Sequence, residues 1–237
     1  MLCILNGFLY LTKLWINEPQ RILIMSLVIE PLRIDDVKEA TAIHCQSFPD
    51  SRSTQFGKLY VRKMFNWFLT YQPNLSFIAK QDGIIVGYVI GAIGGYGRKL
   101  FRYALLEVVV GLLMHPRLWF KRSTFSLWYS YLQGLLPKRV RNKVVAPSDA
   151  KIPISAALAG IGVEPDCQGS GIGRMLMNKF EQAAVQQGAQ FLTLSVFADN
   201  HPARKLYEKS GWIQDNEDLV SGSVHYSKNI SNGESSR

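Results

Sequence analysis

The part of this sequence best suited to chemistry is a short glycine-rich run, residues 168–174. It holds three glycines, Gly169, Gly171 and Gly173, and it ends on a cation, Arg174. A loop at the start of a helix carries backbone N–H groups without intrahelical partners, and the helix dipole adds partial positive charge there. Glycine lets an anion approach such a backbone because no Cβ stands in the way. The run predicts a cradle for a phosphate or pyrophosphate, with a plain tight turn as the alternative.

The residues around this run predict the strand and the helix that such a loop needs. Residues 156–163 are small and apolar, as in a buried strand. From Ile172 onward apolar residues recur at helical spacing, and Gly188 fits the glycine that ends a helix. Two other phosphate-binding patterns do not fit. Arg174 stands where the Rossmann pattern needs its third glycine, and no G-K-[ST] run follows four spacer residues.

Two motifs in this part of the chain resemble the GNAT N-acetyltransferase superfamily. The pattern V-x-P-x-x-Q-x-x-G-x-G-x-x-L over residues 163–176 is similar to the acetyl-CoA loop of that family. The second motif covers residues 194–212. It includes Asn200, Ala203 and Tyr207, and it resembles the strand, the helix and the Gly-aromatic ending that follow the loop. Together the motifs cover about a quarter of the chain, in the family's order and with one helix between them.

The resemblance implies an α/β (α+β) fold, namely a mixed, mostly antiparallel central sheet flanked by helices, with an inserted helical hairpin. The predicted acetyltransferase domain covers residues 25–227, including a basic amphipathic helical insertion at 97–143. An N-terminal extension (1–24) precedes it and a flexible tail (228–237) follows it. The extension is apolar, but it lacks the features of a signal peptide and is too short to span a bilayer.

The resemblance also implies an activity, which is transfer of an acetyl group from acetyl-CoA to a primary amine without a metal. Backbone N–H groups of the loop would hold the CoA pyrophosphate, and those near Ile161 and Val163 would polarise the thioester carbonyl. Tyr207 would be the general acid that protonates the leaving thiolate. Judged alone, Tyr207 could equally be a core residue and Asn200 a helix cap. The residues implied to bind acetyl-CoA are Ile161, Val163, Gln168, Gly169, Ser170, Gly171, Ile172, Gly173, Arg174, Asn200, Ala203 and Tyr207.

The sequence departs from the family at the general base. Many members carry a carboxylate on the strand before the loop, whereas residues 155–162 hold none, and Glu164 and Asp166 are expected to face solvent. The base could be a water chain, His44 or a residue of the insertion, or the amine could arrive neutral. The resemblance places the acceptor side in the first part of the domain. Its polar candidates, which ordinary surface or cap roles would also explain, are His44, Gln46, Asp50, Arg52 and Tyr60.

Local patterns predict the remaining elements. Asp35 or Asp36 is expected to cap a helix that runs to about Phe48, and Asp82-Gly83 is a hairpin-turn signal. The other expected elements are a strand at 27–32, a helix ending near 69, hairpin strands at 74–80 and 84–90, a strand at 190–197, a helix at 200–210 and a final antiparallel pair at 212–214 and 224–227.

The insertion carries all of the excess charge. Its ten basic residues and single acid, Glu107, give it a net charge of +9, the value for the whole chain. Two helices are expected, at 100–114 and 118–136, broken at residues 115–116. Such a segment could contact an anionic membrane surface, bind a phosphorylated acceptor, or be a lid or homodimer contact with solvated charges. Nucleic acid is disfavoured because the cations gather at the predicted helix ends.

Composition narrows the remaining choices. The hydrophobic share of 47% suits a globular core, and three distant cysteines without a C-x-x-C motif indicate neither a disulfide framework nor a zinc site. The expected location is therefore the cytoplasm, with peripheral contact to the inner face of the membrane as an option. The leading hypothesis is an N-acetyltransferase for a small amine such as a phosphate-linked amino sugar. A protein N-acetyltransferase and a non-catalytic acyl-CoA-binding module are the alternatives.

Overall fold

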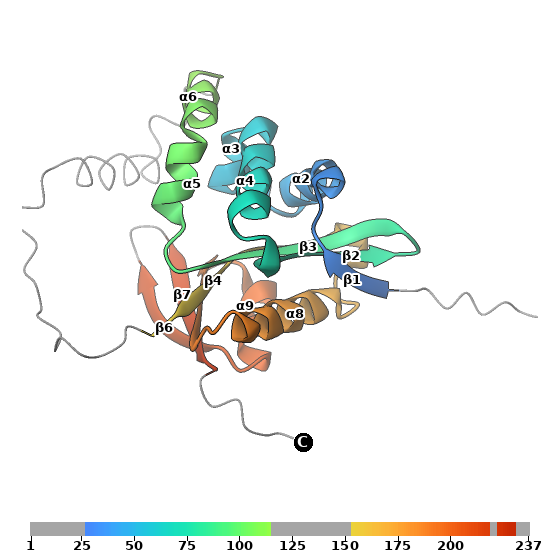
Figure 1. Cartoon of the computed structure of the whole chain (residues 1–237), viewed down its shortest axis with the longest axis vertical. Helices are drawn as coiled ribbons and strands as arrows, with labels where there is room; N and C mark the ends of the chain where they lie inside the picture. Colours follow the sequence, from blue (N-terminus) through green and yellow to red (C-terminus); the bar gives the residue numbers. More distant parts are fainter. Residues whose placement is uncertain (1–26, 115–152, 219–221, 231–237) are drawn as a thin grey trace, which may run out of the picture.

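The computed structural model describes residues 27–114, 153–218 and 222–230, which form a seven-stranded sheet with helices on both faces (Figure 1). The strand order is β1-β2-β3-β4-β5-β7-β6, and β4 with β5 is the parallel pair among antiparallel neighbours. The predicted fold class is therefore confirmed. The strands are β1 (Leu27–Pro31), β2 (Ser76–Gln81), β3 (Ile84–Ile93), β4 (Ser155–Val163), β5 (Phe191–Phe197), β6 (Ile213–Asp218) and β7 (Ser223–Asn229).

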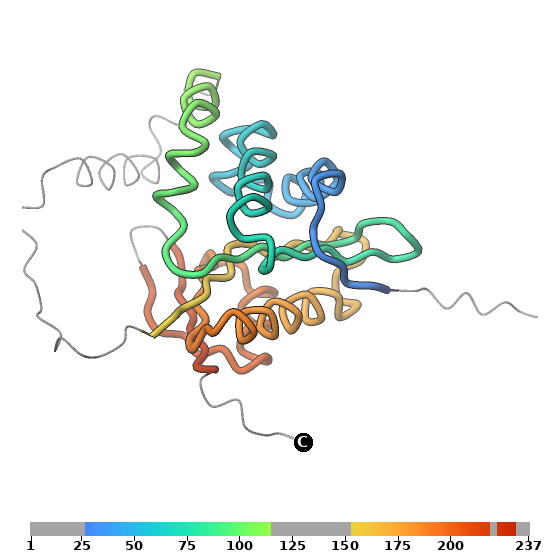
Figure 2. The backbone as a smooth tube through the Cα atoms, in the orientation of Figure 1, coloured from blue at the N-terminus to red at the C-terminus, as the bar shows by residue number. Residues whose placement is uncertain are grey.

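The helices divide between the two faces of this sheet. Those of the first half of the chain lie on one face, above the sheet in Figure 1, whereas α8 and α9 lie on the other. The backbone trace shows the chain completing the first layer before it reaches β4 (Figure 2). The helices are α2 (Val37–Ser47), α3 (Arg52–Gln55), α4 (Lys58–Tyr71), α5 (Gly97–Tyr103), α6 (Leu105–Met114), α8 (Ile172–Gln186) and α9 (His201–Lys209).

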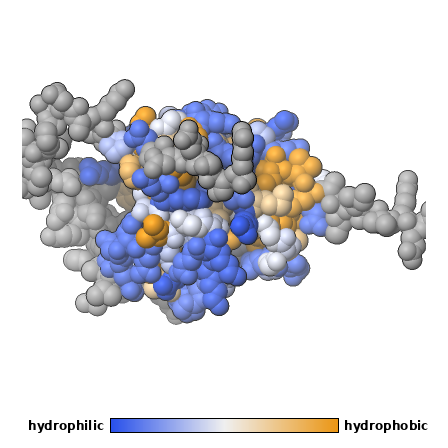
Figure 3. Space-filling view, turned by 90° about the horizontal axis from the view of Figure 1, so that it is seen from below, coloured by the Kyte–Doolittle hydropathy of each residue, from blue (hydrophilic) through white to orange (hydrophobic). Residues whose placement is uncertain are grey.

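Each face of the sheet has its own apolar core. On one face, α2 and α4 pack through residues such as Phe65 and Phe68 against Tyr88 of β3. On the other face, α8 packs through residues such as Phe180 against β2, β3 and β4. The outer side of α8 exposes polar residues, and this side of the molecule is mostly hydrophilic (Figure 3). The sheet is therefore covered on both faces, with the amphipathic α8 as the principal element of the second layer.

Local sequence signals correctly predict several connections. Asp82 and Gly83 join β2 to β3 with positive φ angles of 51° and 83°, as a two-residue type I′ turn requires. Gly188 follows α8 with φ 77°, as predicted for a helix-ending glycine. The Asn200 side chain caps α9 by accepting a hydrogen bond from Ala203 N at 3.2 Å.

Two local predictions are wrong in detail. Asp36 is the N-cap residue of α2, as predicted, but its carboxylate makes no capping hydrogen bond and instead accepts one from Arg33 N and pairs with Lys80. The helix predicted at 100–114 is split into α5 and α6, because Ala104 leaves the helical conformation at φ −105°, ψ 21°. After this break α6 packs closely on the connection between α3 and α4, since a Cβ at Gly111 would lie 2.5 Å from the carbonyl oxygen of residue 56.

Two predicted segments lie outside the residues that the structure describes, and the end of the domain differs slightly from its predicted position. The helix expected at 118–136 and the extension at 1–24 lie outside the described residues. Strand β7 continues to Asn229, so regular structure extends two residues past the predicted end of the domain. Among the described helices, none is both long and apolar enough to cross a lipid bilayer.

The packing of α8 on β3 predicts a large difference between two glycine substitutions. At Gly91 a Cβ would collide with the Phe180 ring and lie 2.9 Å from Ala157 O, whereas at Gly95 it would meet nothing within 4 Å. We expect Gly91→Ala to lower the free energy of unfolding by about 1–3 kcal/mol through overpacking. Gly95→Ala should change it by less than about 0.5 kcal/mol. Urea unfolding measures both, and equal midpoints for the two variants would contradict this close packing.

Candidate functional site

Strand β4 diverges from its parallel neighbour part-way along its length. It pairs with β5 only over residues 155–158, whereas its antiparallel pairing with β3 continues to Val163. The register shifts between Ile90 and Gly91 on β3, which leaves Ala159 as the additional residue of a bulge in β4. The last five residues of β4 therefore have a strand partner on one side only.

The backbone of Ile161 and Val163 faces the open side of β4. Glu164 N donates to Val86 O at 2.9 Å, so Glu164 is directed toward β3. Alternate residues of an antiparallel strand direct their N–H and C=O groups to opposite sides, so Val163 and Ile161 face away from β3. In agreement, Val163 O accepts a hydrogen bond from Ser47 Oγ of α2 at 3.1 Å. Donors held open on a strand in this way can stabilise an oxyanion.

The loop between β4 and α8 presents its backbone to solvent. Gly169 and Gly171 adopt left-handed conformations with φ 80° and 89°, and a Cβ at either position would meet nothing within 4 Å. The hydrogen bond from Met175 N to Gly171 O, 3.1 Å long, opens the helical pattern of α8. The N–H groups of residues 171–174 precede it and point out of the helix end. This geometry suits an anion, as the spacing of the glycines predicts.

Polar contacts of the loop hold its shape. Gln168 Nε2 donates to Val163 O at 3.1 Å, and Ser170 Oγ donates to Cys167 O at 2.6 Å. Both side chains are exposed, as is Arg174 at the first turn of α8. Asp166 is exposed as predicted, whereas Glu164 is half-buried. The charges nearest to the loop in sequence are therefore one cation at the helix end and two acids on its approach.

Gly173 brings the loop, β4 and α9 together. A Cβ at this position would lie 3.5 Å from Leu206 Cδ2 of α9 and 3.8 Å from Val163 Cγ2 of β4. The start of α8 therefore touches both the open end of β4 and the helix that carries Tyr207. Three segments predicted to bind one ligand are neighbours in space, although they span about forty residues of sequence.

Tyr207 lies in the core beneath this meeting point. Its ring is 6.1 Å from that of Trp212 and 5.9 Å from that of Tyr226, and only 5% of the residue is exposed. Burial, followed by the nearby Tyr226, raises the pKa of Tyr207 well above its ordinary value. The phenol therefore keeps its proton at neutral pH. Tyr207 is a core residue by packing, and its raised pKa means that it gives up this proton less readily than a free tyrosine would.

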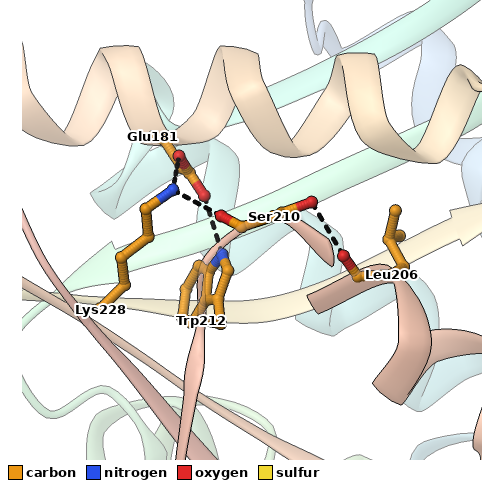
Figure 4. Close-up of polar contacts among 5 residues, drawn as sticks. All are labelled: Glu181, Leu206, Ser210, Trp212 and Lys228. Carbon is orange, nitrogen blue, oxygen red and sulfur yellow. Dashed lines mark hydrogen bonds and ion pairs between the residues drawn. The ribbon is translucent and has the colours of Figure 1, made fainter. Parts of the chain in front are cut away.

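A half-buried polar network attaches the end of α9 to α8 (Figure 4). Glu181 of α8 accepts hydrogen bonds from Trp212 Nε1 at 2.8 Å and from Lys228 Nζ at 2.7 Å. The same ammonium donates to Ser210 O, and Ser210 Oγ donates to Leu206 O, both at 2.8 Å. The Lys228 ammonium thus neutralises the half-buried Glu181 carboxylate, and the network fixes α9 relative to α8.

Four of the five predicted acceptor-side residues lie away from β4, whereas the fifth, His44, is connected to it. Gln46 and Asp50 are exposed, and Arg52 and Tyr60 are half-buried near the start of α3 and in α4. Burial raises the pKa of Tyr60 to about 12, the nearby Tyr96 adds to this, and Arg52 opposes it. These four residues have no described contact with β4.

His44 is the acceptor-side candidate that the fold connects to β4. It is 7% exposed, and its Nδ1 lies 2.5 Å from Tyr88 Oη while its Nε2 lies 2.7 Å from Ser53 Oγ. Burial lowers the pKa of His44 from 6.5 to about 4, so the ring is neutral at neutral pH. Tyr88 and Ser53 are not among the residues predicted from the sequence, because neither belongs to a motif and Tyr88 is 44 residues from His44.

Comparison with known proteins identifies this part of the chain. Residues 144–212 match the model of the acetyltransferase (GNAT) family, so the resemblance to that superfamily is confirmed. A search of curated protein sequences finds no match. Within the described residues, no group of three or more His, Cys, Asp or Glu residues could hold a metal ion.

Several solved structures share the fold at low sequence identity. The PaiA N-acetyltransferase from Thermoplasma acidophilum, in complex with coenzyme A, has 16% identity and a TM-score of 0.53, covering 86% of this chain and 99% of that one. The NatC complex bound to Gag peptide and CoA contains a chain with 16% identity and a TM-score of 0.52, with coverage of 86% and 99%. The ribosomal-protein-alanine N-acetyltransferase from Brucella melitensis has 13% identity and a TM-score of 0.51, with coverage of 85% and 99%.

The buried His44 predicts an acid-sensitive fold. Its folded pKa of about 4 lies below the ordinary 6.5, so between these pH values the unfolded chain binds a proton that the folded chain does not. The free energy of unfolding is therefore unaffected by protonation of His44 above pH 6.5. As the pH falls toward 4, protonation of His44 in the unfolded chain lowers this free energy by up to about 3 kcal/mol. Urea unfolding of the wild type and of His44→Gln between pH 7 and pH 4.5 measures it. Equal losses in both proteins would contradict the assignment to His44.

Proposed function

We propose that this chain transfers the acetyl group of acetyl-CoA to a primary amine. One observation carries the proposal. The open donors of β4, the glycine loop at the start of α8 and the helix bearing Tyr207 meet around Gly173. Acetyl transfer needs a group that holds the CoA phosphates, donors for the thioester oxygen and an acid for the leaving thiolate. In this proposal the glycine loop holds the phosphates, β4 provides the donors, and Tyr207 provides the acid.

The donor half of the proposal assigns each predicted ligand to part of acetyl-CoA. N–H groups of residues 168–174, together with the Arg174 side chain, would hold the pyrophosphate at the positive end of α8. Asn200 and Ala203, at the start of α9, would contact the pantetheine arm. Ile161 and Val163 would direct their N–H groups at the thioester oxygen. Coenzyme A bound to fold neighbours such as the PaiA enzyme supports this donor.

The chemistry follows from this arrangement. The amine nitrogen attacks the thioester carbon, and the carbonyl oxygen becomes an oxyanion near the N–H groups of Ile161 and Val163. Collapse of this intermediate breaks the C–S bond and releases the CoA thiolate. Tyr207, which is protonated at neutral pH, would then give its proton to the sulfur, and the proton that the nitrogen loses as it becomes an amide would restore the phenol.

For the acceptor we propose a small amine such as a phosphate-linked amino sugar. The support is the basic insertion, whose described part exposes Arg98, Lys99 and Arg102 on α5. These cations could bind a phosphate group. The neighbour bound to Gag peptide favours a peptide amine as the second candidate. A cytoplasmic location and a homodimer are compatible with either acceptor, and both stay predictions.

Calorimetric titration with acetyl-CoA and with CoA tests the donor half. We expect micromolar binding, weakened at least about tenfold by Gly171→Glu, because the new carboxylate would lie in the proposed phosphate cradle. Gly188→Glu is the matched control. It places the same residue at another positive φ, at the opposite end of α8 about 25 Å away, and should bind acetyl-CoA as the wild type does. Equal weakening by both changes would refute the cradle.

Turnover of Tyr207→Phe tests the catalytic half. The variant removes one hydroxyl, so we expect about a hundredfold lower kcat with acetyl-CoA affinity within about twofold of the wild type. Tyr226→Phe, which alters a neighbouring buried tyrosine, should retain turnover. Glucosamine 1-phosphate and a peptide with a free N-terminus are the first two acceptors to compare. Unchanged turnover in Tyr207→Phe would exclude Tyr207 as the acid. Tight acetyl-CoA binding without transfer to any amine would favour the acyl-CoA-binding module.

A further inference from the structure

We propose that Tyr88, His44 and Ser53 form the proton exit of the transfer site, through which the acceptor amine loses its proton. This inference rests on the proposed acetyl transfer and assigns the base for which β4 provides no carboxylate. In this proposal Tyr88 accepts the proton of the amine, and His44 and Ser53 pass a proton from Tyr88 toward solvent.

The Tyr88 hydroxyl lies against the backbone of β4. A Cβ on Gly162 would lie 2.6 Å from Tyr88 Cε1 and 3.2 Å from its Oη, and one on Gly160 would lie 3.7 Å from the same oxygen. The phenol therefore rests on the backbone of the diverging part of β4. Glycine at position 162 permits this approach, since any larger residue there would displace the ring, whereas a Cβ at position 160 would make an ordinary contact.

Tyr88 and Tyr207 approach β4 from opposite faces of the sheet. Tyr88 belongs to the core formed with α2 and α4, whereas Tyr207 belongs to the core formed with α8. The two hydroxyls are close enough that an ionised Tyr207 would raise the pKa of Tyr88 further. An acyl group held by the open N–H donors of β4 would therefore have Tyr207, the proposed acid for the leaving thiolate, on the α8 face of the sheet. Tyr88 would lie on the face of α2 and α4, from which the amine would approach.

A continuous chain of hydrogen bonds leads from Tyr88 toward the surface. Tyr88 Oη lies 2.5 Å from His44 Nδ1, and His44 Nε2 lies 2.7 Å from Ser53 Oγ. Ser53 Oγ lies 2.9 Å from Ser51 Oγ, which is 3.0 Å from Thr54 Oγ1. Tyr88 is fully buried, whereas the three hydroxyl residues at the other end are half-buried at the start of α3. The chain thus spans the core from β4 to solvent.

The surroundings of His44 keep its ring neutral. Phe48 of the α2–α3 connection and Phe65 of α4 pack against it, and burial is the cause of its lowered pKa. The titratable groups nearby are Tyr88, Cys45 on the same helix and Tyr207 beyond β4. The charges of this region are Lys58, which acts on Cys45, and Arg52, which acts on Tyr60. A neutral imidazole can accept a proton at Nδ1 while it donates one from Nε2.

The proton transfer balances without a change in net charge along the chain. The ammonium N–H bond breaks and an O–H bond forms at Tyr88, whose own proton passes to His44 Nδ1. The Nε2 proton of His44 passes to Ser53, and a hydroxyl proton leaves through Ser51 to water. One proton enters and one leaves, the imidazole changes tautomer, and the amine becomes a neutral nucleophile. Return of the tautomer through the same bonds restores the starting state.

The pH dependence of Tyr88→Phe tests this chain. With glucosamine 1-phosphate or the free-N-terminus peptide, whichever the wild type acetylates, we expect kcat/KM at pH 7 to fall about 10²- to 10⁴-fold. The deficit should shrink as the pH rises toward the pKa of the amine, because the acceptor then arrives neutral. Acetyl-CoA affinity should stay within about twofold. His44→Gln and Ser53→Ala should show the same pH-dependent rescue with smaller losses.

Tyr96→Phe is the matched control, since it removes a hydroxyl from a residue packed against the same core but outside the chain. It should retain wild-type kcat/KM at each pH. A Tyr88→Phe enzyme with unchanged turnover, or with a loss that is the same at all pH values, would overturn the relay and leave acetyl transfer standing. Failure of the wild type to bind acetyl-CoA would overturn the proposed function and the relay together.

Discussion

The candidate site depends on the unequal pairing of strand β4, which pairs with β3 along its whole length but with β5 along less than half of it. Beyond residue 158 the pairing with β5 ends, while the pairing with β3 continues. Unpaired N–H groups inside a protein cost free energy unless something satisfies them. A bound thioester oxygen would do so, and the rigid pairing with β3 means that these donors need not reorganise when it arrives.

Close approach at glycines allows the flanking groups to reach this strand. Gly162 lets the Tyr88 ring lie on the β4 backbone, and Gly91 lets Phe180 of α8 lie against β3, because a Cβ at either position would collide with the ring. The absence of a Cβ at these two positions therefore sets how closely Tyr88 and α8 pack against β4 and β3. At Gly173 a Cβ would make only ordinary contacts with β4 and α9, so this position marks where the three segments meet.

Burial controls the charge state of the groups around β4. It raises the pKa of Tyr207 and of Tyr88 and lowers that of His44, so all three are neutral at pH 7. The half-buried charges of Glu181 and Lys228 are instead satisfied by each other and by hydrogen bonds, as Figure 4 shows. The groups beside β4 are thus neutral and protonated, whereas this ion pair lies at the junction of α8 and α9, where it has a structural role.

The sequence by itself determined the local features of this protein. The Asp82-Gly83 turn, the Asn200 cap, the glycine loop and the amphipathic α8 follow from residues a few positions apart, because a turn or a cap depends on its own backbone. Only the tertiary structure decided the rest. It inserted β7 between β5 and β6, divided the helix predicted at 100–114, and joined His44 to Tyr88. Those outcomes depend on packing between distant segments, which no local pattern specifies, because contact between them exists only once the sheet has formed.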